Sequence, residues 1–205
     1  MSTLTPAKPV EGCCVLESFA KPKLEKLRPE LPRAAGMVPI ELQTAFSACR
    51  CGVKPWPLYV FGDVGTGKTR FALLVNDWYG GRFFDFADLW AEYVTLCKGE
   101  LRAEASIVSP LAGDALVSQG KWFDVLKASR LVILDDVGRR KDTETGTARD
   151  PLCRLLDVRE SLPTICISNR SPEEIASPEV YDDRTASRMC GRSSVCVRGE
   201  DRRLK

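Results

Sequence analysis

The stretch that decides the fold is Gly62-Asp63-Val64-Gly65-Thr66-Gly67-Lys68-Thr69, in which three glycines lead to a lysine and a threonine. The backbone of such a loop can curl until several N–H groups point at one anion, and glycine leaves that approach open because it has no side chain. Lys68 adds a cation for the outer phosphates, and the Thr69 hydroxyl is a ligand for Mg²⁺. The chain contains no Asn-Lys-x-Asp segment of the kind that reads guanine. The loop therefore predicts a site for ATP with Mg²⁺.

The segments on either side of this loop predict a strand before it and a helix after it. Residues 58–61 form a short apolar run, and the helix expected at 69–79 stops at two glycines. The unbroken apolar run at 131–134 is typical of a strand that is buried on both faces of a parallel sheet. Alternating strands and helices predict a doubly wound α/β domain. The other expected elements are strands at 83–86, 164–168 and 195–197, helices from about residue 40 and at 87–101, 122–128 and 151–160, and two short helices before the last strand.

Polar side chains follow two of these strands. Asp135 and Asp136 end the run 131–134, and the first is placed to hold Mg²⁺ while the second orients or polarises the attacking water. An Asp pair can also simply end a strand and cap a turn. Asn169 follows the strand at 164–168, and its amide comes beside the γ-phosphate if the two strands are neighbours. Asparagine is also a common turn former.

From residue 58 onward, the order of GDVGTGKT, LVILDDVG, TICISNRSPEEI and DDRTASRM resembles the AAA+ ATPases of the bacterial and phage helicase-loader group. These are the DnaC and DnaI type, with the transposition helper IstB as close kin. The resemblance covers about two thirds of the chain. It implies an AAA+ core at residues 37–205, built as a parallel sheet flanked by helices. The helical lid that usually ends such a core is expected to be absent or truncated, because little chain follows residue 197.

The resemblance also implies roles for individual residues. It assigns catalysis to Lys68, Asp136, Asn169 as sensor 1, and Arg188. Arg188 falls at the arginine-finger position, with Arg184 one helical turn earlier. A finger acts across a subunit boundary, so the resemblance implies a homo-oligomer. Without the resemblance, a surface salt bridge is the competing interpretation of Arg188.

The resemblance also leads to expectations about the rate of ATP turnover and about the partners. Many related ATPases carry Glu where Asp136 stands, and because Asp is shorter by one methylene we expect slow hydrolysis, stimulated by the oligomer or by DNA. The expected partners are a replicative helicase and single-stranded DNA, and the function is helicase loading or remodelling in DNA replication. The alternatives are an IstB-type transposition helper and a nucleotide-gated DNA-binding module that does not hydrolyse ATP.

Basic residues that could contact DNA lie at 139–141 and in the Arg-rich end, 184–203. Neither cluster contains the interleaved aromatic residues on which single-stranded bases stack, so a solvated charged surface is the simpler interpretation. By resemblance, Arg202 or Arg203 is a sensor-2-like arginine, and a basic tail explains them equally well.

Composition limits the remaining possibilities. The 205 residues suit one well-buried domain, and a net charge of +2 gives no global argument for a nucleic-acid partner. Residues 1–36 contain five prolines and predict an extended or partly disordered arm. No apolar stretch is long enough to cross a bilayer, and we expect a cytoplasmic protein. The nine cysteines do not indicate a disulfide framework, and the apolar surroundings of Cys97, Cys166 and Cys196 predict reduced thiols in the core.

Overall fold

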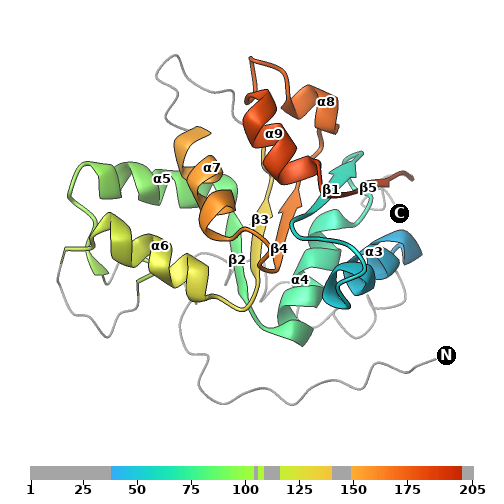
Figure 1. Ribbon diagram of the computed structural model, residues 1–205, viewed down its shortest axis with the longest axis horizontal. Helices are drawn as coiled ribbons and strands as arrows, with labels where there is room; N and C mark the ends of the chain where they lie inside the picture. The colour runs from blue at the N-terminus through green and yellow to red at the C-terminus, as the bar shows by residue number, and fades with distance from the viewer. Residues whose placement is uncertain (1–37, 104–105, 109–115, 140–148, 200–205) are drawn as a thin grey trace.

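The computed structural model describes residues 38–103, 106–108, 116–139 and 149–199. Its strands form one sheet in the order β2-β3-β4-β1-β5, and every neighbouring pair is parallel (Figure 1). The predicted arm at 1–36, residues 140 and 141 of the basic loop, and Arg202 and Arg203 lie outside the described residues. The strands are β1 (Leu58–Gly62), β2 (Arg82–Asp85), β3 (Val132–Asp135), β4 (Thr164–Ile167) and β5 (Ser193–Val197). The helices are α3 (Ile40–Arg50), α4 (Lys68–Tyr79), α5 (Phe86–Cys97), α6 (Gln119–Ala128), α7 (Arg149–Val158), α8 (Pro172–Ile175) and α9 (Asp183–Cys190).

Helices cover both faces of the sheet, as the apolar strands require. Leu58 and Val60 of β1 belong to the core that includes α3 and α4, whereas Tyr59 belongs to the core that includes α5 to α9. The same alternation holds in β3, where Ile133 faces the first core and Leu134 the second. A strand between two helical layers is apolar at every position, which explains the uninterrupted run that predicted β3. The predicted α/β fold with a parallel sheet is confirmed.

The strand order places β4 between β1 and β3. The loops that follow β1, β3 and β4 therefore meet at the carboxyl-terminal edge of the sheet. In open α/β sheets this edge is where ligands bind. The predicted position of Asn169 required that the strands before Asp135 and Asn169 be neighbours. These strands, β3 and β4, are paired.

Two predicted boundaries around β2 are wrong. The strand ends at Asp85 and Phe86 already belongs to α5, because the Asp85 side chain accepts a hydrogen bond from the Ala87 N–H at 2.9 Å and caps the helix. The helix then ends at Cys97 rather than at residue 101. Gly99, two residues after this end, has a φ of 74°, the left-handed conformation that commonly follows a helix. An apolar run that continues across a strand–helix junction hides the boundary from sequence reasoning.

The prediction for the thiols is correct for Cys166, which is buried in β4, and wrong for Cys97 and Cys196, which are exposed. Cys196 lies on β5, an edge strand whose Ser194 and Cys196 are open to solvent. Cys97 is the last residue of α5 and is not among the buried residues of that helix. All the cysteines among the described residues are free thiols.

A buried arginine joins the ends of three elements. Arg159 is 1% exposed and follows α7 directly. Its guanidinium donates to the carbonyls of Leu126, Ser129 and Pro163 and to the Thr164 hydroxyl, which connects the ends of α6 and α7 to the start of β4. Burial lowers its pKa to about 10. The guanidinium therefore donates to the Ser129 carbonyl and is a second donor for the carbonyls of Leu126 and Pro163, which also accept from the Ser129 and Val132 N–H groups.

A buried carboxylate connects α5 to its neighbours. Glu92 accepts hydrogen bonds from the Ser106 hydroxyl and the Ile107 N–H, both at 2.9 Å, and from the Trp122 indole N–H at 2.8 Å. Burial raises its pKa, and the hydrogen bonds oppose that shift only in part.

The pKa of Glu92 predicts a pH-dependent stability. Because the folded-state pKa lies above the unfolded value of 4.5, the contribution is fully present below about pH 4.5 and is lost as the pH rises through the folded pKa. The free energy of unfolding of the wild type should therefore fall relative to that of Glu92→Gln as the pH rises from 4.5 towards neutrality. Urea unfolding of both proteins across this range measures the difference. Glu41→Gln, at an exposed position of α3, is the control, and an equal slope for all three proteins would contradict the prediction.

Candidate nucleotide site

The loop between β1 and α4 has the backbone geometry that its glycines predict. Gly67 precedes the first turn of α4 with a φ of 96°, a left-handed conformation that favours glycine. The Thr66 hydroxyl donates to the Asp63 carbonyl at 2.9 Å and closes the loop. The loop thus leads straight into the amino terminus of α4, where free N–H groups and the helix dipole favour an anion.

Gly62 is required for a reason that the sequence did not reveal. Its φ is 134°, and a Cβ atom on this residue would lie 2.0 Å from the carbonyl oxygen of Val197. The two residues are paired at the ends of β1 and β5. Gly62 therefore permits the close approach of the edge strand, in addition to opening the loop for a phosphate.

Lys68 is the first residue of α4 and is 5% exposed. Its ammonium donates to the carbonyls of Gly62 at 2.8 Å and Asp63 at 2.6 Å. The charge consequently lies over the loop itself, at the start of the helix. This is where the outer phosphates of a nucleotide would be held.

The two predicted magnesium ligands are brought together. The Thr69 hydroxyl donates to Asp135 Oδ1 at 3.2 Å, although the residues are 66 positions apart in the chain. Asp135 ends β3 and is 1% exposed. A hydroxyl and a carboxylate are hard oxygen ligands of the kind that Mg²⁺ prefers, so these residues fit that ion.

Asp136 differs from Asp135 in exposure and in backbone conformation. Its φ is 57°, which is unusual for a residue other than glycine and recurs at functional sites. Its side chain is 31% exposed and lies 3.5 Å from the guanidinium of Arg139, which is 77% exposed. The second acidic residue of the pair is therefore partly accessible, and Arg139 is a cationic neighbour.

Hydrogen bonds join the loop after β4 to the loop after β3. The Ser168 hydroxyl donates to the Val137 carbonyl at 2.6 Å, and Arg170 Nε donates to the Gly138 carbonyl at 2.8 Å. Tyr59, in the middle of β1, donates its hydroxyl to the Arg170 carbonyl at 2.7 Å. Asn169 lies between these anchored residues and is itself exposed.

Sequence reasoning missed these bracing residues. The Ser168 and Arg170 side chains flank the predicted Asn169, so their position next to a strand end was an available signal. Tyr59 lies within an apolar run, where nothing distinguishes it from a core residue.

The structure does not bring Arg188 to the loop 62–69 of its own chain. Arg188 and Arg184 line a surface pocket of about 340 Å³ whose wall includes Pro57, the residue before β1. The phosphate loop follows the other end of β1, and five strand residues span roughly 16 Å. In the described chain, Arg188 Nε donates to a carboxylate oxygen of Asp157. Its predicted role as a finger stays a prediction.

No family model and no curated protein matches the sequence. Solved structures do match: AMPPCP-bound DnaA from Aquifex aeolicus has a TM-score of 0.57 and 20% identity over 77% of this chain and 45% of that one. A DNA replication initiation factor has a TM-score of 0.54 and 19% identity over 97% of this chain and 52% of that one. For DnaI the values are 0.52 and 20%, over 80% and 83%.

The chain has the AAA+ P-loop fold. The sequence resemblance predicted this fold, and the prediction is confirmed. The chain spans about half the length of the first two of these proteins. Within the described ranges of this AAA+ fold, no helix has both the length and the apolar character needed to cross a membrane.

Proposed function

We propose that the chain binds ATP with Mg²⁺ and hydrolyses it as an AAA+ ATPase of DNA replication, in the loading or remodelling of a replicative helicase. The observation that carries the proposal is the 3.2 Å contact between the Thr69 hydroxyl and the Asp135 carboxylate, at the edge of the sheet where the phosphate loop ends. Lys68 and Asn169 reach the same edge from α4 and from the end of β4. Four residues from three distant parts of the chain thus lie at one edge of the sheet, which supports a nucleotide site there.

Each residue has a role that follows from its position. Lys68 and the amino terminus of α4 neutralise the outer phosphates, and Thr69 and Asp135 hold Mg²⁺, which would shield the negative charge of the β- and γ-phosphates. Asp136, which is partly exposed and outside the hydrogen-bonded pair of Thr69 and Asp135, accepts a proton from water or orients it. Asn169 supplies an amide to the γ-phosphate. The short Asp136 side chain and its ionic neighbour Arg139 favour slow turnover.

The structural neighbours support the choice of nucleotide and of process. DnaA, which shares the fold, binds AMPPCP in one structure and AMPPCP with single-stranded DNA in another. The DNA replication initiation factor, which aligns with 97% of this chain, supports the assignment to replication. We therefore propose single-stranded DNA and a replicative helicase as partners of this chain.

A homo-oligomer is part of the proposal because of where Arg188 lies. Its pocket is at the opposite end of β1 from the phosphate loop of the same chain. A guanidinium there can reach a γ-phosphate only if the phosphate belongs to a neighbouring subunit. Arg184 lines the same pocket and would add a second cation to that boundary.

Mixing two inactive variants tests the proposal. ATP turnover per subunit should rise with protein concentration and fall about a thousandfold in Arg188→Ala, because a finger in trans carries this much of phosphoryl transfer. Lys68→Ala should be inactive as well, and a mixture of the two should regain activity, since one subunit supplies the intact loop and the other the intact finger. Phosphate release measures each protein and the mixture.

Arg154→Ala is the control, because Arg154 contacts Phe123 and Gln119, on α6 and away from the pocket. It should leave turnover unchanged. Turnover that does not depend on protein concentration, or a mixture that remains inactive, would contradict the trans arrangement.

A second function is supported by the geometry of Asp136. Its left-handed backbone and its contact with Arg139 suit a nucleotide-gated DNA-binding module that holds ATP without hydrolysis. Tight ATP binding without phosphate release at any protein or DNA concentration would favour this module over the ATPase.

A further inference from the structure

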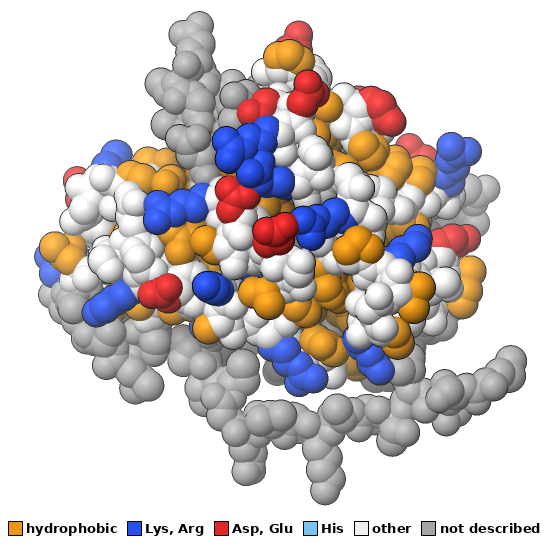
Figure 2. Space-filling model, in the orientation of Figure 1, with side chains coloured by type: hydrophobic (Ala, Val, Ile, Leu, Met, Phe, Trp, Pro, Cys, Tyr) orange, Lys and Arg blue, Asp and Glu red, His pale blue; other side chains and the backbone are white. Residues whose placement is uncertain are grey.

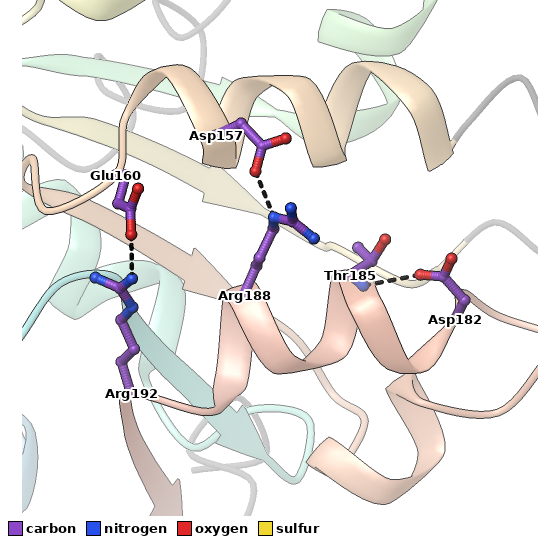
Figure 3. Close-up of polar contacts among 6 residues, drawn as sticks. All are labelled: Asp157, Glu160, Asp182, Thr185, Arg188 and Arg192. Atoms are coloured by element: carbon purple, nitrogen blue, oxygen red, sulfur yellow. Dashed lines mark hydrogen bonds and ion pairs between the residues drawn. The ribbon is translucent and has the colours of Figure 1, made fainter.

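Two ion pairs connect α7 and the residues just after it to α9 and the residues just after it, at one side of the pocket that contains Arg188. Arg188 Nε donates to Asp157 Oδ1, and Arg192 Nη2 donates to Glu160 Oε1 (Figure 3). Asp157 is in the last turn of α7, and Glu160 follows that helix by two residues. On the face shown in Figure 2, basic and acidic side chains gather together over α7 and α9. Arg188 and Arg192 therefore have acidic partners within their own chain.

The contact to Asp157 uses only one edge of the Arg188 guanidinium. The bond meets the side chain at Nε, and the two terminal nitrogens lie beyond it (Figure 3). Within the described ranges, no hydrogen bond engages these terminal nitrogens. The Arg188 side chain is 31% exposed and lines the pocket, so its free end is accessible to a group that enters from outside.

The backbone beneath Arg188 is also held in place. Asp182 caps α9 by accepting a hydrogen bond from the Thr185 N–H at 2.8 Å, one turn before Arg188. Met189, the next residue along the helix, is fully buried in the core. Because α9 is anchored at its start and on its inner face, the remaining freedom of Arg188 lies in its own long side chain.

We propose that Asp157 is a positioning residue that orients Arg188, by holding Nε, so that the terminal nitrogens face the phosphates of a neighbouring subunit. This inference rests on the proposed function, in which Arg188 acts across a subunit boundary. A long arginine side chain loses rotamer freedom when it binds, and a side chain that is already held loses less. The planar guanidinium suits this role, because it can donate a hydrogen bond from Nε to Asp157 and still present its two terminal nitrogens as donors.

The parallel pair provides a matched comparison. Glu160 and Arg192 have the same chemistry, lie beside the same pocket and bridge the same two segments. Arg192 lies beyond the carboxyl end of α9, outside the helix that carries Arg188. If ion pairing merely attached α7 to α9, both pairs would matter equally. If Asp157 orients Arg188, only the Asp157 pair affects turnover.

The experiment measures ATP turnover of the full chain against protein concentration for Asp157→Ala, Asp157→Asn and Glu160→Ala. Asp157→Ala should lower the maximal turnover about two- to tenfold, the factor that corresponds to ordering one long side chain, with unchanged ATP affinity. Asp157→Asn keeps an acceptor oxygen for Nε and should recover most of the loss. Glu160→Ala should match the wild type. In an Arg188→Ala background, Asp157→Ala should have no further effect, because the residue acts only through Arg188.

Thermal unfolding separates orientation from structural support. All three single variants should unfold within a few degrees of the wild type, since exposed ion pairs contribute little to stability. Equal loss of turnover in Asp157→Ala and Glu160→Ala would overturn the proposal in favour of a structural staple. Faster turnover in Asp157→Ala would overturn it in favour of a latch that restrains Arg188. If Arg188→Ala itself turns over ATP normally, the trans-finger function fails, and the role of Asp157 fails with it.

Discussion

Lys68→Ala should weaken ATP binding by at least about a hundredfold, because it removes a charged donor from phosphates that meet little water in the loop. Lys68 is 5% exposed and its ammonium already donates to the loop carbonyls of Gly62 and Asp63, so the protein holds it in place before nucleotide arrives. Titration with a fluorescent ATP analogue in the presence of Mg²⁺ measures the affinity.

Two further measurements make the Lys68 result specific. Lys121→Ala, at an exposed position of α6, removes an equal charge and should bind ATP as the wild type does. Thermal unfolding without nucleotide checks that Lys68→Ala is folded, because the variant also loses two hydrogen bonds to the loop. A folded Lys68→Ala protein with wild-type affinity would contradict the assignment of the phosphate site.

Arg159→Met should lower the free energy of unfolding by about 3 to 5 kcal/mol, because it removes several charge-assisted hydrogen bonds to buried backbone carbonyls. Methionine has a similar length and no charge, so the loss comes from the hydrogen bonds rather than from an empty space. The carbonyls of Leu126, Ser129 and Pro163 would all be affected. Chemical denaturation of both proteins measures the difference.

Arg154→Met is the matched control for this prediction. Arg154 is on α7, the helix that Arg159 follows, but its guanidinium stacks on the Phe123 ring at 4.4 Å and bonds a side chain at the surface. Its replacement should cost less than about 1 kcal/mol. Similar losses of unfolding free energy for the two variants would show that the buried hydrogen bonds of Arg159 contribute no more to stability than the surface contacts of Arg154.

Most of the fold follows from local patterns that short stretches of sequence contain. The apolar runs predicted all the strands, and the predicted bounds of most elements agree with the structure to within three residues. The boundary between β2 and α5 was not predicted, because Phe86 continues the apolar run. Only the hydrogen bond from the Ala87 N–H to the Asp85 side chain marks the start of the helix. The exposure of Cys196 was not predicted either, because its burial depends on which strand forms the edge of the sheet.

The sequence by itself determined the phosphate loop, the acidic pair, Asn169 and the class of fold, because each depends on residue types at short spacing in parallel strands and the turns after them. Only the tertiary structure decided that Thr69 and Asp135 touch, that Gly62 admits β5, and that Arg159 and Glu92 are buried. It also decided that Arg188 lies at the far end of β1 and against Asp157. These relations join residues that are tens of positions apart, and the order of the strands, which no local pattern specifies, brings them together.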